Sequence, residues 1–176
     1  KTIGSYEDLV TTIGEGKPVI ASIKMDGMLV IAGYENNQIR LASLEGRILT
    51  NLPVTDEIAR KLNGKNKTTL VGELYGVDNQ GNELPFNKTL SLVRKPTNTE
   101  DEQRIRIAIF DVLEYDGKDI SNMPYWQRST VITNNFKNGT YANPVYTKEG
   151  DVSIVKKLWD QAVIDDNHEG LGVRAD

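Results

Sequence analysis

The sequence predicts an α+β fold, in which helices interrupt a mostly antiparallel sheet. Stretches of alternating or continuous apolar residues recur along the chain, short helical patterns lie between them, and turn-forming residues separate the two kinds of element. The length of 176 residues predicts a single domain over residues 1–176. A chain of this size buries about 70% of its unfolded surface, so a core forms without cross-links.

The first half of the chain combines two short helices with four strands. A capped helix begins at Ser5 and ends at Gly14, and a second is capped by Thr55 and ends at Asn63 and Gly64. The strands expected here cover residues 19–23, 29–34, 38–44 and 68–74. We predict that the first three of these strands form an antiparallel meander.

The second half adds one long strand, two helices and a final strand. Residues 104–113 are apolar on both faces, which predicts a central strand. Residues 96–102 are expected to form a polar loop, and Trp126 and Trp159 to lie in helix cores. The remaining expected elements are a turn at 78–82, a helical turn around 90–93, helices starting near Pro124 and Asp151, and a strand over 169–174.

Composition limits the chemistry that this chain can perform. There is no cysteine and a single histidine, His168, which excludes thiolate nucleophiles, zinc–thiolate sites and cages of several histidines. The net charge of −4 argues against indiscriminate binding to nucleic acid. No apolar run approaches the ~20 residues of a membrane span and no signal peptide is recognisable, so we expect an intracellular protein without a membrane partner. Chemistry here must rest on Lys, Asp and Glu.

One segment, Lys24-Met25-Asp26-Gly27, lies between two predicted strands and would hold an amine at the rim of a sheet. By itself this pattern is also typical of a hairpin turn with a solvated lysine. Three further segments at strand ends follow it in the sequence: Gly72-Glu73, Phe110-Asp111 and Glu169-Gly170. Four such segments in this order are harder to explain as chance.

In these segments the chain resembles the nucleotidyltransferase (adenylation) domain of the ATP-dependent DNA ligases. That domain belongs to the covalent nucleotidyltransferase superfamily, which includes RNA ligases and mRNA capping enzymes. The resemblance extends from Pro18 to Arg174. It implies two antiparallel β-sheets with flanking helices that form a nucleotide cleft, an ATP-grasp-like arrangement.

By this resemblance, Lys24 is the nucleophile that attacks the α-phosphate of ATP and becomes lysyl-AMP. An ordinary lysine amine has a pKa near 10.4 and is neutral in roughly one molecule in a few thousand at pH 7, so such a site must favour the free amine. Asp26 and Gly27 complete the nucleotide-binding motif, and the glycine allows the backbone to approach the nucleotide.

The resemblance assigns the other roles to three side chains. Glu73 matches the ribose-binding carboxylate, Phe110 the aromatic ring that stacks on adenine, and Glu169 the acidic position that binds Mg²⁺. Each also has a plainer interpretation: Glu73 as a solvent-facing strand residue, Phe110 as core, and Glu169 as a turn carboxylate. Asp111 is a weaker candidate, which supports the cleft or caps a strand end.

The chain departs from the family at several positions. The usual Lys-x-Asp-Gly-x-Arg has Leu29 in place of its arginine, and the usual Ser-Arg-x-Gly has Leu44. An isobutyl group cannot replace the planar fork of arginine in phosphate or ribose contacts. A leucine at the first of these positions resembles some RNA ligases. Ser22 stands where the family often has a glutamate.

We therefore predict an ATP-dependent ligase that takes AMP on Lys24, passes it to a 5′-phosphate and seals nicked DNA in repair or replication. A Lys-x-Lys motif and an oligonucleotide-binding (OB-fold) domain are expected beyond Arg174, so the chain is expected to be a truncated adenylation domain. The alternatives are an RNA ligase acting on RNA ends, a guanylyl-transferring capping enzyme, and a nucleotide-binding module that no longer catalyses.

Overall fold

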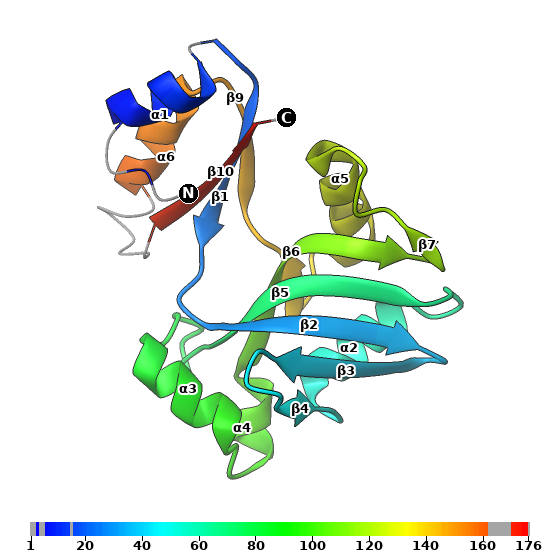
Figure 1. Ribbon diagram of the computed structural model, residues 1–176. Helices are drawn as coiled ribbons and strands as arrows, with labels where there is room; N and C mark the ends of the chain where they lie inside the picture. The colour runs from blue at the N-terminus through cyan, green and yellow to red at the C-terminus, as the bar shows by residue number, and fades with distance from the viewer. Residues whose placement is uncertain (1–2, 4–5, 15, 162–169, 176) are drawn as a thin grey trace. The chain divides into compact units, whose positions relative to one another are not determined.

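The computed structural model describes residues 3, 6–14, 16–161 and 170–175 (Figure 1). The chain divides into two compact units, a smaller one from Lys1–Met25 and Val145–Asp176 and a larger one from Asp26–Pro144. The helices are α1 (Tyr6–Ile13), α2 (Pro53–Lys61), α3 (Phe86–Arg94), α4 (Thr99–Gln103), α5 (Tyr125–Phe136) and α6 (Ser153–Trp159). The strands are β1 (Val19–Lys24), β2 (Met28–Glu35), β3 (Gln38–Ser43), β4 (Ile48–Leu49), β5 (Thr68–Gly76), β6 (Ile105–Tyr115), β7 (Lys118–Asp119), β8 (Ala142–Pro144), β9 (Thr147–Gly150) and β10 (Gly170–Ala175).

The smaller unit contains a three-stranded antiparallel sheet in the order β10-β1-β9. The register pairs Val19 with Ala175 and Lys24 with Gly170. The predicted meander is therefore wrong at its first strand, because β1 pairs with strands from the far end of the chain and not with β2. Apolar residues of α1, β1 and α6 form the core: Leu9, Val19, Ala21, Val152, Val155 and Leu158.

The larger unit contains a seven-stranded sheet in the order β4-β3-β2-β5-β6-β7, with β8 paired to β6. All pairs are antiparallel except β6 with β8, which run parallel. The two largely antiparallel sheets and their flanking helices confirm the predicted α+β fold. The strand expected to be central, β6, does lie inside the sheet. It pairs with β5 on one edge and with β7 and β8 on the other.

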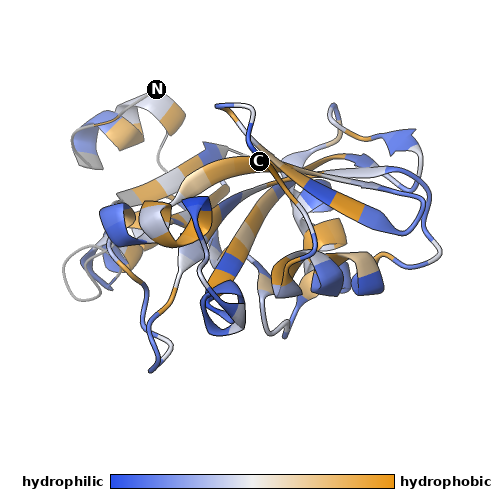
Figure 2. Ribbon diagram, turned by 90° about the horizontal axis from the view of Figure 1, so that it is seen from below, coloured by the Kyte–Doolittle hydropathy of each residue, from blue (hydrophilic) through white to orange (hydrophobic). Residues whose placement is uncertain are grey.

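One face of the larger sheet is covered and the other is more open. Burial alternates along β2 and β5, as period-2 patterning requires when one face packs on a core. The helices carry both hydrophobic and hydrophilic residues (Figure 2). The hydrophobic residues of α2, α3 and α5 pack into this core. Core residues in these helices, with the C-cap residue Leu62 of α2, are Val54, Ile58, Leu92, Val93, Ile132 and Phe136.

Several local predictions need correction. Thr55 is not the N-cap residue of α2, because it lies in the first turn of the helix. Its hydroxyl accepts a hydrogen bond from the backbone N–H of the N-cap residue Leu52 at 2.8 Å, so Thr55 still contributes to capping. The expected polar loop at 96–102 contains α4, whose N-cap is the Asn98 side chain. Trp126 and Trp159 are 47% and 44% exposed and are not core residues.

Candidate functional site

Lys24 is the last residue of β1, in the smaller unit. Burial decreases along this strand from Val19 to the exposed Lys24, so the apolar half fixes the strand in the core and Lys24 lies at its exposed end. Lys24 is therefore a strand residue and does not sit in a hairpin turn. Its strand partner Gly170 directly follows Glu169 in the sequence. Glu169 itself lies outside the described residues.

Asp26 and Gly27 open the larger unit and lie against β5. A Cβ atom at Gly27 would overlap the carbonyl oxygen of Leu74 and would lie 3.2 Å from Cγ of Glu73. Only glycine lets the backbone approach β5 this closely. The backbone N–H of Asp26 donates to Oε1 of Glu83 at 3.4 Å. The segment that follows the lysine is thus packed on the strand that carries the predicted ribose carboxylate.

Glu73 lies in β5 on the more open face of the sheet. It is partly buried, and it pairs with Leu29 of β2 on one side and Ala108 of β6 on the other. Two residues further on, Tyr75 has the same orientation and pairs with Arg106. Burial raises the pKa of the Tyr75 phenol, the negative charge of Glu83 raises it further, and Arg106 opposes both. This face therefore combines a carboxylate, a phenol and a guanidinium, and the charge of Glu83 acts on the phenol.

Phe110 lies at a β-bulge in β6. The register shifts between the pairs Val71–Asp111 and Gly72–Ile109, which leaves Phe110 as the extra residue. Because Phe110 follows Ala108 by two residues, it lies on the same face of the sheet as Glu73. Phe110 is partly buried, so it is not a fully enclosed core residue.

Asp111, the weaker candidate, holds a buried ion pair. Its Oδ1 lies 2.8 Å from Nε of Arg128, and its Oδ2 lies 3.3 Å from Nη2, so the carboxylate is bound in a bidentate fork. Both side chains are nearly buried, at 12% and 13% exposed. The hydroxyl of Tyr125 donates a hydrogen bond to the carbonyl of the neighbouring Phe110 at 2.7 Å. Asp111 therefore supports the bulge instead of facing solvent.

The sequence did not identify Tyr125, Arg128 or Glu83 as part of this region. One signal was available for Arg128: a carboxylate such as Asp111 inside an otherwise apolar strand needs a cationic partner. The spacing of Tyr125 and Arg128, three apart on a predicted helix, also places both on one face.

The structure brings Asp26, Gly27, Glu73 and Phe110 into the larger unit and places Lys24 in the smaller one. Within residues 3, 6–14, 16–161 and 170–175, no three His, Asp or Glu side chains gather to form a metal site. In the same part of the chain, no helix has the length and apolar character of a membrane span.

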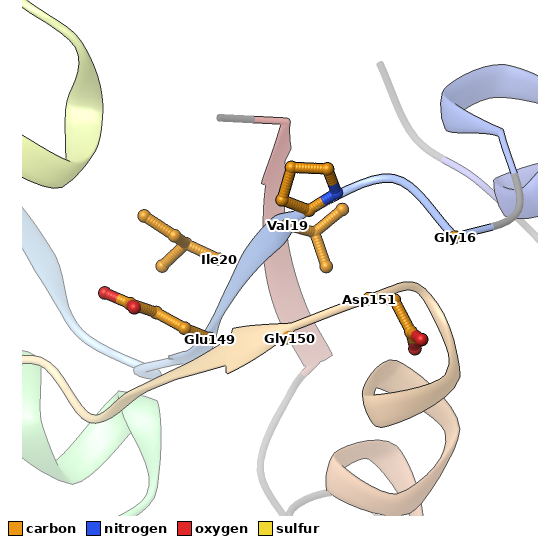
Figure 3. A pocket seen from close by; sticks show the side chains of 7 residues that line it. Gly16, Val19, Ile20, Glu149, Gly150 and Asp151 are labelled. Atoms are coloured by element: carbon orange, nitrogen blue, oxygen red, sulfur yellow. The ribbon is translucent and has the colours of Figure 1, made fainter.

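A hollow of about 480 Å³ lies beside β1 and β9 in the smaller unit (Figure 3). None of the described site residues lines it, so we assign it no part in the site. Its lining residues are Gly16, Pro18, Val19, Ile20, Glu149, Gly150 and Asp151.

Solved structures with the same fold are DNA ligases. A mycobacterial DNA ligase D, solved as a complex with ATP and MES, matches with a TM-score of 0.71 at 20% identity, over 99% of this chain and 52% of its own. The ligase domain of LigD from M. tuberculosis matches with a TM-score of 0.69 at 20% identity, over 93% of this chain and 50% of its own. These similarities concern the fold.

Proteins with related sequences are also DNA ligases. A DNA ligase 2 from Methanosarcina acetivorans is 24% identical and one from Methanosarcina mazei 26% identical, each over 95% of this chain. The chain spans 31% of the length of each of these relatives. The family described as ATP dependent DNA ligase domain matches residues 1–175. Because this match covers nearly the whole sequence, the chain belongs to the ATP-dependent DNA ligase domain family.

Proposed function

We propose that this chain is the adenylation domain of an ATP-dependent DNA ligase and that Lys24 is its nucleophile. The observation that carries the proposal is the packing of Gly27 against Glu73 on β5. Only two residues separate Gly27 from Lys24, so covalent geometry keeps their Cα atoms within about 11 Å whatever the arrangement of the two units. The amine and the carboxylate can therefore act on one nucleotide.

The first step forms a covalent bond between Lys24 and AMP. The neutral Nζ attacks the α-phosphorus of ATP, a P–N bond forms, the P–O bond to pyrophosphate breaks, and the amine loses a proton to solvent. AMP then passes to a 5′-phosphate, and a 3′-hydroxyl displaces AMP and seals the strand. The exposed end of β1 suits this role because the amine must reach successive substrates.

Glu73 and Phe110 would hold the nucleoside. A partly buried carboxylate can accept hydrogen bonds from ribose hydroxyls, and a partly buried ring on the same sheet face can stack on adenine. Stacking of a base on an aromatic side chain is worth about 1–3 kcal/mol. Asp26 and Gly27 complete the nucleotide site from the adjoining backbone.

Mg²⁺ enters the proposal through Glu169. A carboxylate oxygen is a ligand type that Mg²⁺ prefers, and the metal would neutralise charge on the phosphates. The described residues hold no acidic cluster that could bind the ion by itself, so we derive no step from it.

Nicked DNA is the substrate that we propose, with an intracellular role in repair or replication. The expected Lys-x-Lys motif and OB-fold domain of a longer ligase belong to the same proposal. RNA ends are the second candidate because of two leucines at positions where DNA ligases carry arginine. Leu29 lies beside Glu73, and Leu44 is 79% exposed. A nucleotide-binding module without catalysis is the third candidate.

Intact-mass spectrometry after incubation with ATP tests the proposal. We expect a mass gain equal to one AMP, which Lys24→Ala abolishes and Lys17→Ala, a change at another exposed lysine of the smaller unit, preserves. An adduct from GTP alone would point to a capping enzyme, and ATP binding without an adduct to an inactive module. Sealing assays on nicked DNA and on RNA ends then separate the two ligase candidates.

A further inference from the structure

The bulge that carries Phe110 lies at a gap in the hydrogen-bond ladder of β6. On the outer edge of this strand, β8 pairs with Ile107–Ile109 and β7 pairs with Glu114 and Tyr115. Neither strand reaches the segment 110–112, whereas the carbonyl of Leu113 accepts the N–H of Ile120, just after β7, at 3.0 Å. Backbone groups on this edge need other partners, because unpaired backbone groups are costly when buried.

The first turn of α5 supplies one such partner and also binds the neighbouring carboxylate of Asp111. The hydroxyl of Tyr125 donates to the Phe110 carbonyl at 2.7 Å, and Arg128 binds both carboxylate oxygens of Asp111. Nη1 of the same guanidinium donates to the carbonyls of Ser121 at 3.1 Å and Met123 at 2.6 Å. We refer to Tyr125 and Arg128 as the α5 support.

The α5 support is rigid by its own contacts. Tyr125 is 8% exposed, and Cζ of Arg128 lies 5.4 Å from the centre of its ring. Oδ1 of Asp111 also accepts the N–H of Val112 at 2.8 Å, which fixes the residue after the bulge. These contacts hold the bulge on the C-terminal side of the Cα atom of Phe110, and the pairing of Ile109 with Gly72 and Pro144 holds it on the N-terminal side, while the ring remains only partly buried.

We propose that Tyr125 and Arg128 are positioning residues that set the orientation of the Phe110 ring for a purine base. This inference rests on the proposed function, in which Phe110 stacks on adenine. A stacked ring must lie parallel to the base at van der Waals distance, and a bulge without support would allow the ring to tilt. Neither residue touches the nucleotide; both act through the backbone of residues 110 and 111.

The test uses Tyr125→Phe, which removes one hydroxyl and keeps the ring. The matched control is Tyr34→Phe, which removes the hydroxyl that bonds Asn37 at 2.8 Å in the same unit. The probe is the triphosphate of 2-aminopurine riboside, whose fluorescence falls when its base stacks on an aromatic ring. Affinity for ATP and the melting temperature are measured in parallel.

We expect Tyr125→Phe to reduce quenching at saturating probe and to weaken ATP binding about fivefold, because a tilted ring loses part of the stacking interaction with the base. Tyr34→Phe should leave both readouts unchanged. In a Phe110→Leu background, Tyr125→Phe should have no further effect on binding, because the residue acts through the ring. Arg128→Lys, which keeps the charge but loses the fork, should also reduce quenching.

Two results would overturn the inference while leaving the proposed function intact. One is unchanged quenching and affinity in Tyr125→Phe, with or without a lower melting temperature. The other is the same loss of affinity in the Phe110→Leu background as in the wild type. If the wild-type protein neither binds ATP nor quenches the probe, the proposed function fails, and this inference fails with it.

Discussion

The two units of this protein differ in how far apart in the sequence their strands lie. The larger unit is one stretch, Asp26–Pro144, whose main strands β2, β3, β5 and β6 pair mostly with a near neighbour in the chain. The smaller unit joins residues 1–25 to residues 145–176, and among the described strands β1 pairs with β9 and β10. Closing such a long loop costs conformational entropy before its contacts form. The proposed nucleophile thus lies on the unit assembled from distant segments, and the proposed nucleoside-binding residues lie on the locally paired one.

The core of the larger unit should give the largest effect. Phe136 of α5 is 1% exposed and packs with residues from several strands. We expect Phe136→Ala to lower the free energy of unfolding by about 3–5 kcal/mol, through lost burial and the cavity left behind. Chemical denaturation monitored by circular dichroism measures this. A loss below about 1 kcal/mol would show that this core does not hold the unit together.

The core of the smaller unit should give a similar but more local effect. Leu158 of α6 is 3% exposed and belongs to the small cluster around β1. We expect Leu158→Ala to cost about 3 kcal/mol and to accelerate amide exchange in β1, β9 and β10. Exchange in β2 and β5 should keep its wild-type rate. Equal acceleration in β5 would show that the two units unfold together, which would remove the contrast between them.

The same contrast explains what the sequence could predict. The strands predicted over residues 29–34 and 68–74 correspond to β2 and β5, where each strand has one buried face. The partners of β1 could not be predicted from local pattern, since β10 lies almost 150 residues away and a nearer strand was available. Strands of two to four residues, such as β4 and β8, are too short to show any alternation.

In the candidate site, too, some features could be predicted from the sequence and others depend on the fold. The resemblance to DNA ligases assigned roles to Lys24, Asp26 and Gly27, and the structure gives a physical reason for the glycine in its close approach to β5. The bulge at Phe110 leaves no trace in the sequence, because one extra residue looks like a continued strand. For Asp111 the sequence indicates that a cationic partner is needed, but it contains many cations, and only the fold selects Arg128.

A smaller effect is expected at the end of the larger unit, where the chain leaves for β9. Glu57 is 3% exposed, and its carboxylate accepts the backbone N–H groups of residues 140, 141 and 142 at 3.0–3.2 Å. Glu57→Gln keeps one acceptor oxygen and turns an amide toward these donors. We expect a loss of about 2 kcal/mol by thermal denaturation. Asp56→Asn, a change at the exposed neighbour, should cost below about 0.5 kcal/mol, and an equal loss in both would contradict a specific role for Glu57.

The smallest effect is a titration that reports on the larger unit alone. Burial and the charge of Glu83 raise the pKa of Tyr75 above 10.0, and Arg106 lowers it. The folded protein therefore holds the phenol proton more tightly than the unfolded chain does. The stability that this provides is complete below pH 10 and decreases as the pH rises through the folded pKa.

Two substitutions should move this pKa in opposite directions. Glu83→Gln should lower it, although burial keeps it above the ordinary value, and Arg106→Gln should raise it. Phenolate absorbance measured against Tyr75→Phe gives the titration of this one side chain. The titration should be the same in a Leu158→Ala background, because that change disturbs only the smaller unit. A shift in that background would mean that the environment of Tyr75, and with it the face that carries Glu73, depends on the order of the unit that carries Lys24.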